Sequence, residues 1–339
     1  MQRPGDRMFF ILGRGRSGTT LLSALLDSHP AVSVAPEALF ALMMSRKYGR
    51  CRSWDANLVD SFLDDLFRER RILSWRIDRK GLRQEILSLG GSPGYADICR
   101  CVYAHYAGRT GKAADALLGD KNPHYCLAAG KLQRLFPEAR FVHIVRDPRD
   151  NVLSFRRVRF DLNSPGALAR RWCTYNTAVM RAAAHCPNRF HLLRFEDLLL
   201  EPERILHGVC AFLGVDYLPA MMEEYARSPG IPDLPWHGNV AGPLEARRAY
   251  RWRDSLSQSI ACRIQRLCGS LTGYFDYPDA CRKGPHRAGI RYTLGSLIGR
   301  AATLFERMVM ALPYRLAMAV TNAYRMRTGT LSDQGTEPV

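Results

Sequence analysis

A short glycine-rich segment constrains this chain more than any other feature. Residues 9–12 are four consecutive apolar residues, a pattern typical of a strand buried on both faces of a parallel sheet. Three glycines follow within residues 13–18, and leucines then recur at helical spacing over 21–26. A strand, a glycine turn and a helix direct backbone N–H groups and the positive end of a helix dipole at one place. The sequence therefore predicts an anion-binding loop suited to phosphate.

The spacing of this loop resembles a P-loop with one departure. Gly13-x4-Gly18 fits the P-loop pattern, but Thr19 stands where nucleotide hydrolases carry lysine. That lysine contacts the β- and γ-phosphates of a triphosphate, so its absence argues against ATP or GTP chemistry. A loop for another phosphate ligand and a purely structural glycine turn remain as interpretations. The polar residues within 16–20 supply a cation and hydroxyl donors, and they favour the ligand-binding loop.

The charge balance narrows the class of ligand. Lys and Arg number 49 against 32 acidic residues, which gives a formal net charge of +17. Such a surplus suggests an anionic ligand, an anionic membrane surface or nucleic acid. No nucleic-acid-binding motif, repeat period or zinc-ligand spacing accompanies the charge. We therefore expect an anionic ligand and no nucleic-acid partner.

The cysteines and the N-terminal residues indicate in which cellular compartment the protein is expected. The ten cysteines are scattered without a CxxC motif, so we expect most of them to be reduced and buried. Residues 1–7 are polar and lead directly into the first predicted strand, which leaves no room for a secretory signal. No uninterrupted apolar run reaches transmembrane length. These observations favour a cytoplasmic protein.

Apolar runs and helical patterns alternate through the N-terminal two thirds of the chain. We expect strands at residues 9–12, 31–34, 116–119, 139–145 and 190–194. Helical patterns follow most of them, and residues 38–115 are mainly helical. This alternation is the signature of a three-layer α/β/α fold with a central parallel sheet.

The C-terminal part carries a different pattern. Residues 228–247 are rich in proline and glycine and are expected to form a loop. Residues 294–327 place apolar residues at helical spacing, interleaved with arginines. They can be helices that pack on the core, or a basic amphipathic surface for peripheral association with an anionic membrane. Residues 331–339 are expected to be a disordered tail.

Two separated motifs resemble the 3′-phosphoadenosine-5′-phosphosulfate (PAPS)-dependent sulfotransferase family. Residues 13–21 resemble its 5′-phosphosulfate loop, and residues 145–150 with Ser154 resemble its 3′-phosphate motif. Their order, separation and strand-to-helix contexts carry the resemblance, which covers roughly residues 8–278. It implies a P-loop NTPase-like sulfotransferase fold, with the sulfotransferase domain over 1–283. The residues that follow, 284–330, are expected from their own pattern to form C-terminal basic amphipathic helices.

The resemblance implies a donor site. PAPS would be the sulfuryl donor and PAP, its desulfated product, would remain; no metal would be required. The implied cofactor-binding residues are Arg16, Ser17, Gly18, Thr19, Thr20, Arg146 and Ser154. Arg146 and Ser154 would hold the 3′-phosphate, the group that distinguishes PAPS from ordinary adenylates.

The resemblance also implies catalytic residues. Arg16 stands where cytosolic small-molecule sulfotransferases carry lysine, and arginine there is similar to the tyrosylprotein and carbohydrate branches. Glu37 occupies the position of the tyrosylprotein catalytic glutamate and is expected to be the general base. Its alternative role is a helix-start carboxylate. Lys121, together with Arg16, would stabilise the leaving phosphate. His124 is the alternative base, although its spacing from the lysine is one residue longer than in the cytosolic branch.

The resemblance departs from the family pattern after Ser154 and extends to a later segment. The tyrosylprotein branch has an arginine four residues after the serine, whereas this chain has Val158 flanked by Arg157 and Arg159. Residues 251–253 resemble the late basic-tryptophan segment that closes over the nucleotide.

Function classes other than a sulfotransferase remain open from the sequence. The first is a divergent P-loop kinase or NTPase, and the second is a non-catalytic nucleotide-binding protein of the membrane surface. Within the sulfotransferase interpretation the acceptor would offer a hydroxyl or an amine, on a glycan, a lipid or a peptide, and no segment of the sequence selects among them.

Overall fold

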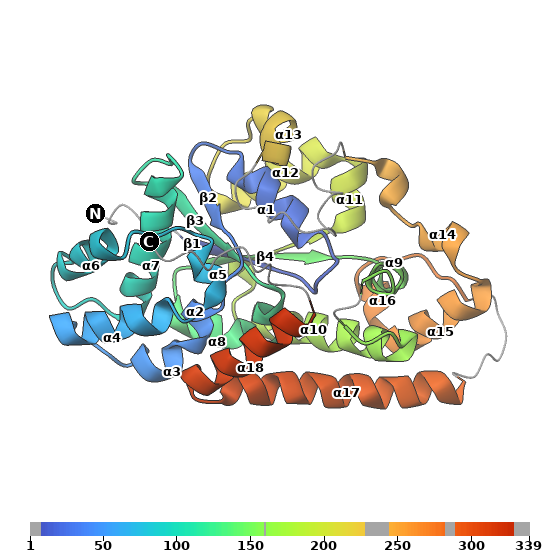
Figure 1. The fold of residues 1–339 in the computed structure, drawn as a ribbon. Coiled ribbons are helices and arrows are strands. Elements are labelled where there is room, and N and C mark those ends of the chain that lie inside the picture. The colour runs from blue at the N-terminus through green and yellow to red at the C-terminus, as the bar shows by residue number, and fades with distance from the viewer. Residues whose placement is uncertain (1–7, 159–160, 228–243, 282–288, 329–339) are drawn as a thin grey trace.

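A parallel five-stranded sheet lies at the centre of the computed structural model, which describes residues 8–158, 161–227, 244–281 and 289–328 (Figure 1). The strands are β1 (Met8–Leu12), β2 (Val32–Ala35), β3 (Leu117–Lys121), β4 (Arg140–Val145) and β5 (Phe190–Arg194). Their order across the sheet is β2-β3-β1-β4-β5, and every pairing is parallel. The expected parallel sheet is confirmed.

The central strand fixes one functional edge of the sheet. In β1, Ile11 lies opposite Lys121 of β3 and Val142 of β4. Because all strands run in the same direction, their carboxyl ends meet at one edge, where ligands bind in open α/β sheets. The glycine loop leaves β1 at this edge, and Glu37 and Arg146 follow β2 and β4 there.

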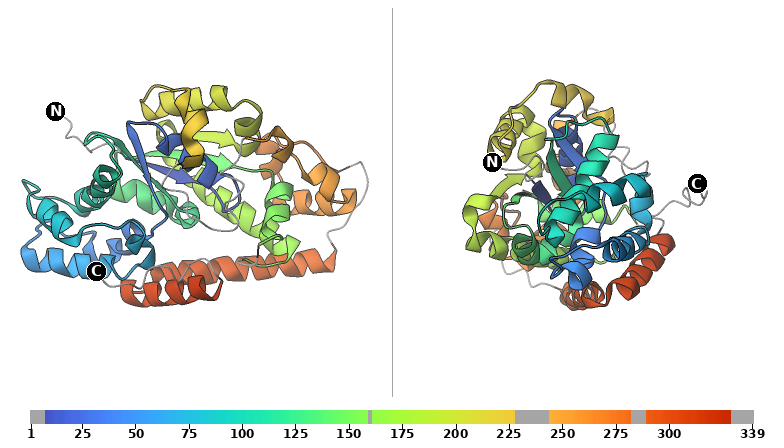
Figure 2. Two further views of the ribbon diagram at one scale, coloured as in Figure 1. Left: turned by 45° about the horizontal axis from the view of Figure 1, so that its top comes forward. Right: turned by 90° about the vertical axis from the view of Figure 1, so that its left-hand side faces the viewer.

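Helices cover both faces of the sheet, as the alternation of side chains along β1 requires. Phe9 and Ile11 pack into one core with α1 (Thr19–Asp27) and α12 (Pro202–Leu213), while Phe10 and Leu12 pack into the opposite core. On the first face α11 (Phe195–Leu200) and α13 (Ala220–Glu224) complete the layer; Figures 1 and 2 show it above the sheet. The expected three-layer α/β/α arrangement is confirmed.

The opposite face is covered by more helices. Residues 40–109 form α2 (Phe40–Met43), α3 (Ser45–Tyr48), α4 (Ala56–Leu66), α5 (Arg70–Leu73), α6 (Arg79–Leu87) and α7 (Tyr95–Arg109). The remaining helices up to residue 274 are α8 (Ala129–Leu135), α9 (Pro148–Phe155), α10 (Pro165–His185), α14 (Trp252–Ser255), α15 (Gln258–Cys268) and α16 (Leu271–Tyr274). Short 3₁₀ turns occur at Pro123–Ala128, Pro187–Arg189, Tyr225–Arg227 and Ala246–Arg248. The mainly helical character expected for residues 38–115 is confirmed.

The long helix α10 was not predicted, although the sequence carries a signal for it. Ser164 caps its first turn, its hydroxyl accepting from Ala167 N, and Pro165 occupies the first helical position. The helix passes beneath the sheet and buries Trp172 and Tyr175. It thereby forms the floor on which the C-terminal helices rest.

The C-terminal helices pack on the rest of the protein. Helix α17 (Ile290–Ala311) lies along α10, and α18 (Tyr314–Arg327) turns back against α4 and α5 (Figures 1 and 2). Tyr314 is buried in the same core as Phe10, and its hydroxyl donates to Asp65 O over 2.8 Å. Over the residues that the structure describes, no helix is both long and apolar enough to cross a bilayer.

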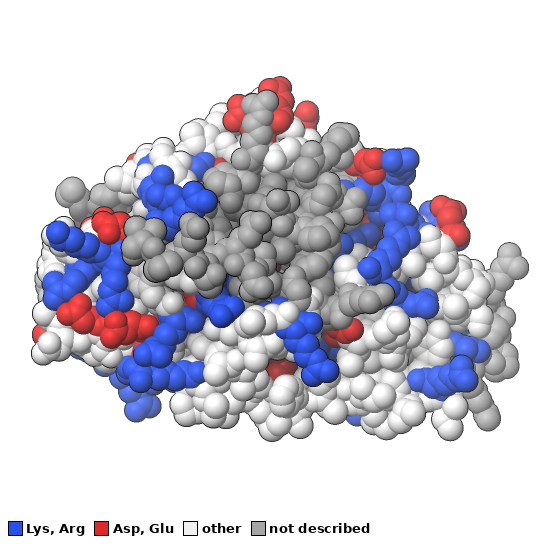
Figure 3. Space-filling view, viewed as in Figure 1, with Lys and Arg blue, Asp and Glu red and all other residues white. Residues whose placement is uncertain are grey.

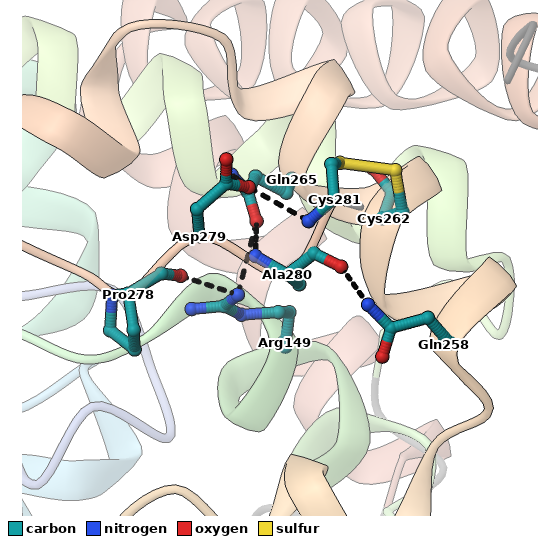
Figure 4. The surroundings of a disulfide bond; sticks show 8 residues. All are labelled: Arg149, Gln258, Cys262, Gln265, Pro278, Asp279, Ala280 and Cys281. Carbon is teal, nitrogen blue, oxygen red and sulfur yellow. Dashed lines mark hydrogen bonds between the residues drawn. A yellow bond between two sulfur atoms is a disulfide. The ribbon is translucent and has the colours of Figure 1, made fainter. Parts of the chain in front are cut away.

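One pair of cysteines departs from the expectation of reduced thiols. Cys262 on α15 and Cys281 form a disulfide with their Cα atoms 4.9 Å apart, while the other eight cysteines are free (Figure 4). Most of the cysteines are thus reduced, as expected, but the spacing of Cys262 and Cys281 did not reveal their pairing, because the segment after α16 doubles back onto α15. Disulfides are typical of oxidising compartments, so this pair gives no support to a cytoplasmic location.

Two expectations fall outside the described residues. The tail at 331–339 is one, and most of the proline- and glycine-rich loop at 228–247 is the other.

Candidate functional site

The glycine loop requires glycine at its turn into α1. Gly18 has φ +90°, in the left-handed region, and a Cβ there would lie 2.2 Å from the Phe195 ring. A Cβ on Gly13 would lie 2.7 Å from Ile144 O of β4. The loop is therefore packed between β4 and α11, and its first helical N–H groups stay directed at the carboxyl edge of the sheet.

Asn151 of α9 fixes the other side of the loop, a contact that the sequence did not reveal. Its Nδ2 donates to Gly15 O over 3.0 Å and to Ser17 Oγ over 3.2 Å. Its Oδ1 accepts from Arg14 Nε over 3.3 Å, and Arg14 also pairs with Asp161 at 2.9 Å. Arg14 is thus a buried structural cation that ties the loop to α9. Of the two loop arginines, Arg16 is the one that contacts the predicted site residue Ser154.

Three arginines gather beside the loop. Arg16 Nε donates to Ser154 Oγ over 3.1 Å, and Arg146 Nη1 donates to Arg16 O over 3.2 Å. Arg146 Nη2 reaches Arg248 O at 3.4 Å. Burial, with the charges of Arg146 and Arg248, lowers the pKa of Arg16 to about 10; burial and Arg146 likewise lower the pKa of Arg248. Cations held this close are complementary to a ligand that carries more than one negative charge.

Arg146 is both fixed in place and partly unsatisfied. Its guanidinium stacks on the Phe195 ring at 4.6 Å from the centroid, yet its Nε finds no hydrogen-bond partner among the described residues. The turn that carries it is held by Glu196, whose Oε1 accepts from Asp147 N over 3.0 Å. Burial and the nearby Asp147 raise the pKa of Glu196 to about 8. A buried donor without a partner is expensive, and an anion at this place would satisfy it.

The second part of the site centres on Glu37. Lys121 Nζ lies 2.5 Å from Glu37 Oε1 and donates to Thr20 Oγ1 over 3.2 Å. Arg71 of α5 pairs with the other carboxylate oxygen. Burial alone would raise the pKa of Glu37, but Lys121 and Arg71 outweigh it and hold that pKa well below its usual range. Glu37 is therefore an ionised carboxylate at neutral pH, and helix α2 begins only at Phe40, so a helix-start role does not describe it.

His124 lies on the same edge but has a different neighbour. Its Nδ1 is 2.6 Å from Glu306 Oε1 of α17. Glu306 also accepts from Tyr175 OH over 2.6 Å and pairs with Arg171 at 3.1 Å. Burial alone would raise the pKa of Glu306, but His124 and Arg171 lower it to about 2. Helix α17 thus supplies a carboxylate to the segment after Lys121.

The predicted site residues therefore fall into two joined groups at one edge of the sheet. The donor-binding candidates are Arg16, Ser17, Gly18, Thr19, Thr20, Arg146 and Ser154, and the catalytic candidates are Glu37 and Lys121 with Arg16. The link between the groups is the contact of Lys121 with Thr20. Within the described residues, no group of three or more His, Cys, Asp and Glu side chains could hold a metal ion.

Four residues of the site were not identified from the sequence. Asn151, Arg71, Arg248 and Glu306 reach it from elements far apart in the chain. Arg248 precedes the expected segment 251–253, whose Trp252 is buried under Arg149 at 3.9 Å from the ring centroid. The structure does not show which arginine replaces the one that the tyrosylprotein branch has at the position of Val158. Arg157 is exposed, and Arg159 lies outside the described residues.

Residues 9–219 match the protein-family model that is described as Sulfotransferase family. Among curated proteins, protein-tyrosine sulfotransferase 2 of Gallus gallus is 29% identical over 234 residues, covering 66% of this chain and 56% of the relative. The protein-tyrosine sulfotransferase of Drosophila melanogaster is 28% identical over 237 residues, covering 66% and 42%. The chain spans about half the length of these curated relatives. The expected similarity to the tyrosylprotein branch is confirmed.

Two solved structures share the fold. The sulfotransferase domain from the Synechococcus PCC 7002 olefin synthase has a TM-score of 0.58 at 24% identity, covering 82% of this chain and 97% of that one. The sulfotransferase domain from the curacin biosynthetic pathway has a TM-score of 0.55 at 19% identity, covering 82% and 99%. The expected P-loop NTPase-like sulfotransferase fold is thereby confirmed.

Proposed function

The chain belongs to the sulfotransferase family, and we propose that it transfers the sulfuryl group of PAPS to a hydroxyl or amine of an acceptor. The observation that carries this proposal is the bridge made by Lys121. One ammonium contacts both Thr20 of the glycine loop and Glu37, so a single cation lies between the donor-binding loop and a candidate base. This arrangement suits an in-line transfer, in which the leaving group and the attacking group lie on opposite sides of the transferred group.

The residues present fit a 3′,5′-bisphosphorylated nucleotide. The loop from Arg16 to Thr20 offers N–H and hydroxyl donors to the 5′-phosphosulfate. Arg146, with its unpartnered Nε, and Ser154 of α9 would hold the 3′-phosphate. Arg248 adds a third guanidinium at this side. An adenylate without a 3′-phosphate would offer no anionic group to Arg146 and Arg248.

Bound PAPS supplies the sulfuryl group: a bond from the acceptor oxygen or nitrogen to sulfur forms while the bond from sulfur to the 5′-phosphate oxygen breaks. Glu37 takes the acceptor proton, and Lys121 with Arg16 stabilises the charge that grows on the departing phosphate oxygen. PAP then leaves with the bridging oxygen. The chain's own residues account for the proton and for the leaving-group charge.

Glu37 must gain basicity to act in this way. Its two cations hold its pKa low, and a carboxylate so stabilised is a weak base. We propose that Lys121 transfers its hydrogen bond from Glu37 to the nucleotide phosphate, leaving Arg71 to orient the carboxylate. His124 stays the alternative base, because a carboxylate at its Nδ1, here Glu306, orients the imidazole and leaves the other ring nitrogen to accept a proton.

The first acceptor class to test is a peptide tyrosine. The curated relatives bear the name protein-tyrosine sulfotransferase, and the phenol hydroxyl of tyrosine is a suitable attacking group. Glycan and lipid hydroxyls are the other acceptor classes to include in the same screen.

A thermal-shift titration tests the donor site without knowledge of the acceptor. A ligand that binds only the folded state raises its melting temperature by mass action. We expect PAP without added metal to stabilise the protein more than AMP, ADP or ATP does, and Arg146→Ala to remove the advantage of PAP over AMP. The exposed Arg204→Ala serves as a control for charge. Stabilisation by ATP only in the presence of Mg²⁺ would instead favour a divergent P-loop kinase or NTPase.

A further inference from the structure

Helix α17 has its small residues inside and its large apolar residues outside. Its buried positions are Gly295, Ser296, Gly299 and Thr303, all small or polar. A Cβ on Gly295 would lie 2.4 Å from Ser164 Oγ, and one on Gly299 would lie 2.6 Å from Ala167 O. The helix therefore needs its glycines in order to lie directly on the backbone of α10.

The outward face of α17 is apolar. Ten of the fifteen exposed large hydrophobic side chains among the described residues belong to α17 and α18. On α17 they include Leu294, Leu297, Ile298, Leu304, Phe305 and Met308, which are between 44% and 60% exposed. At 3.6 residues per turn these six fall within an arc of roughly 120°. Scattered exposed apolar residues are ordinary, but a continuous arc on one helix marks an interaction surface.

Arginines flank this arc. On the same helical wheel, Arg291 lies at one border and Arg300 and Arg307 lie at the other, and all three are exposed. The only acidic residue from 289 to 328 is Glu306, which faces inward and pairs with Arg171. In Figure 3 the lower edge of the molecule, over α17, is largely white with blue patches beside it.

We propose that this surface, the outward arc of α17 with its three bordering arginines, docks the protein on an anionic lipid bilayer. A helix lying in the interface buries its apolar arc among the acyl chains, while the arginines extend toward the lipid phosphates. A second copy of the chain is the less suitable occupant. A twofold interface would set the same patch against itself and bring the like-charged arginines together.

Vesicle flotation of the full chain tests the proposal. We expect the protein to float with vesicles of phosphatidylcholine mixed with phosphatidylglycerol, and to stay behind with phosphatidylcholine alone or at high salt. Arg300→Gln/Arg307→Gln is expected to reduce the partition coefficient on the order of 30-fold, at about 1 kcal/mol for each cation near the surface. The matched control Arg204→Gln/Arg247→Gln removes the same charge from exposed sites elsewhere and should bind as the parent does.

A second pair of variants separates the apolar contribution. Leu297→Ser/Phe305→Ser is expected to abolish flotation, whereas Leu87→Ser/Leu200→Ser, at exposed positions outside α17, should retain it. Unchanged PAP-induced stabilisation would show that each variant is folded. Equal flotation of all variants, or no flotation of the parent protein, would overturn the proposal. So would a dimer, measured by light scattering, that Leu297→Ser/Phe305→Ser dissociates.

Discussion

Replacing Glu37 with glutamine is expected to move folding stability and nucleotide affinity in opposite directions. In the structure Lys121 Nζ contacts Glu37 at 2.5 Å and Thr20 at 3.2 Å, so a phosphate at the loop competes with the carboxylate for one cation. Removing the carboxylate removes that competitor. It also deprives Lys121 and Arg71 of the charge that compensates them in the folded protein.

The magnitudes follow from the burial of the pair. A hydrogen bond to a charged group contributes about 1.5–3 kcal/mol, so releasing Lys121 is expected to tighten PAP binding by about 10-fold or more. Breaking a buried ion pair by removing one partner costs about 3–5 kcal/mol. Because the Glu37 side chain is 21% exposed and that of Lys121 is 4% exposed, we expect a loss near the lower end of that range.

Calorimetric titration with PAP and urea unfolding, both at neutral pH, measure the two effects. Glu201→Gln is the matched control, since it removes one negative charge from an exposed pair with Arg204 and should change neither quantity. Weaker or unchanged PAP affinity in Glu37→Gln would refute the exchange of Lys121 between the carboxylate and the nucleotide. Undiminished turnover in that variant would exclude Glu37 as the base.

Three further predictions concern the glycine loop, helix α17 and the disulfide. Gly18→Ala should abolish PAP-induced stabilisation in a thermal-shift assay, because strain of about 1–2 kcal/mol at positive φ adds to the clash with Phe195. The stability advantage of the parent protein over Glu306→Gln should be complete above pH 4.5 and should shrink as pH falls toward 2, since the pKa of Glu306 is depressed to about 2; urea midpoints across this pH range measure it. Cys262→Ser should lower stability by about 3 kcal/mol and remove any effect of a reductant on the urea midpoint, because the bond to Cys281 closes a loop with a sequence separation of 19.

The local patterns of the sequence predicted the sheet and the glycine loop. The complete burial of residues 9–12, and the glycines after them, follow from short-range rules on parallel strands and tight turns. Glu37 and Arg146 were identified, with their expected roles, from the family resemblance. Each follows a strand, and parallel strands bring such positions to one edge, which explains why the two lie on the same side of the sheet.

The remaining parts depend on contacts between distant segments. Arg71 meets Glu37 across 34 positions, and Glu306 meets Tyr175 across 131, so no local pattern marks either pair. The disulfide was missed for the same reason, since the chain after α16 returns to α15. Helix α10 is different, because its Ser164-Pro165 start is a local signal for a helix N-terminus.

A crystal structure with bound PAP would show whether Lys121 moves from Glu37 to the nucleotide. We expect the 5′-phosphate on the loop from Arg16 to Thr20 and the 3′-phosphate between Arg146 and Ser154. We also expect Lys121 to contact the 5′-phosphate and to have lost its hydrogen bond to Glu37. A nucleotide bound elsewhere or in the reverse orientation, or a Lys121–Glu37 pair that stays intact beside the bound phosphate, would contradict these expectations.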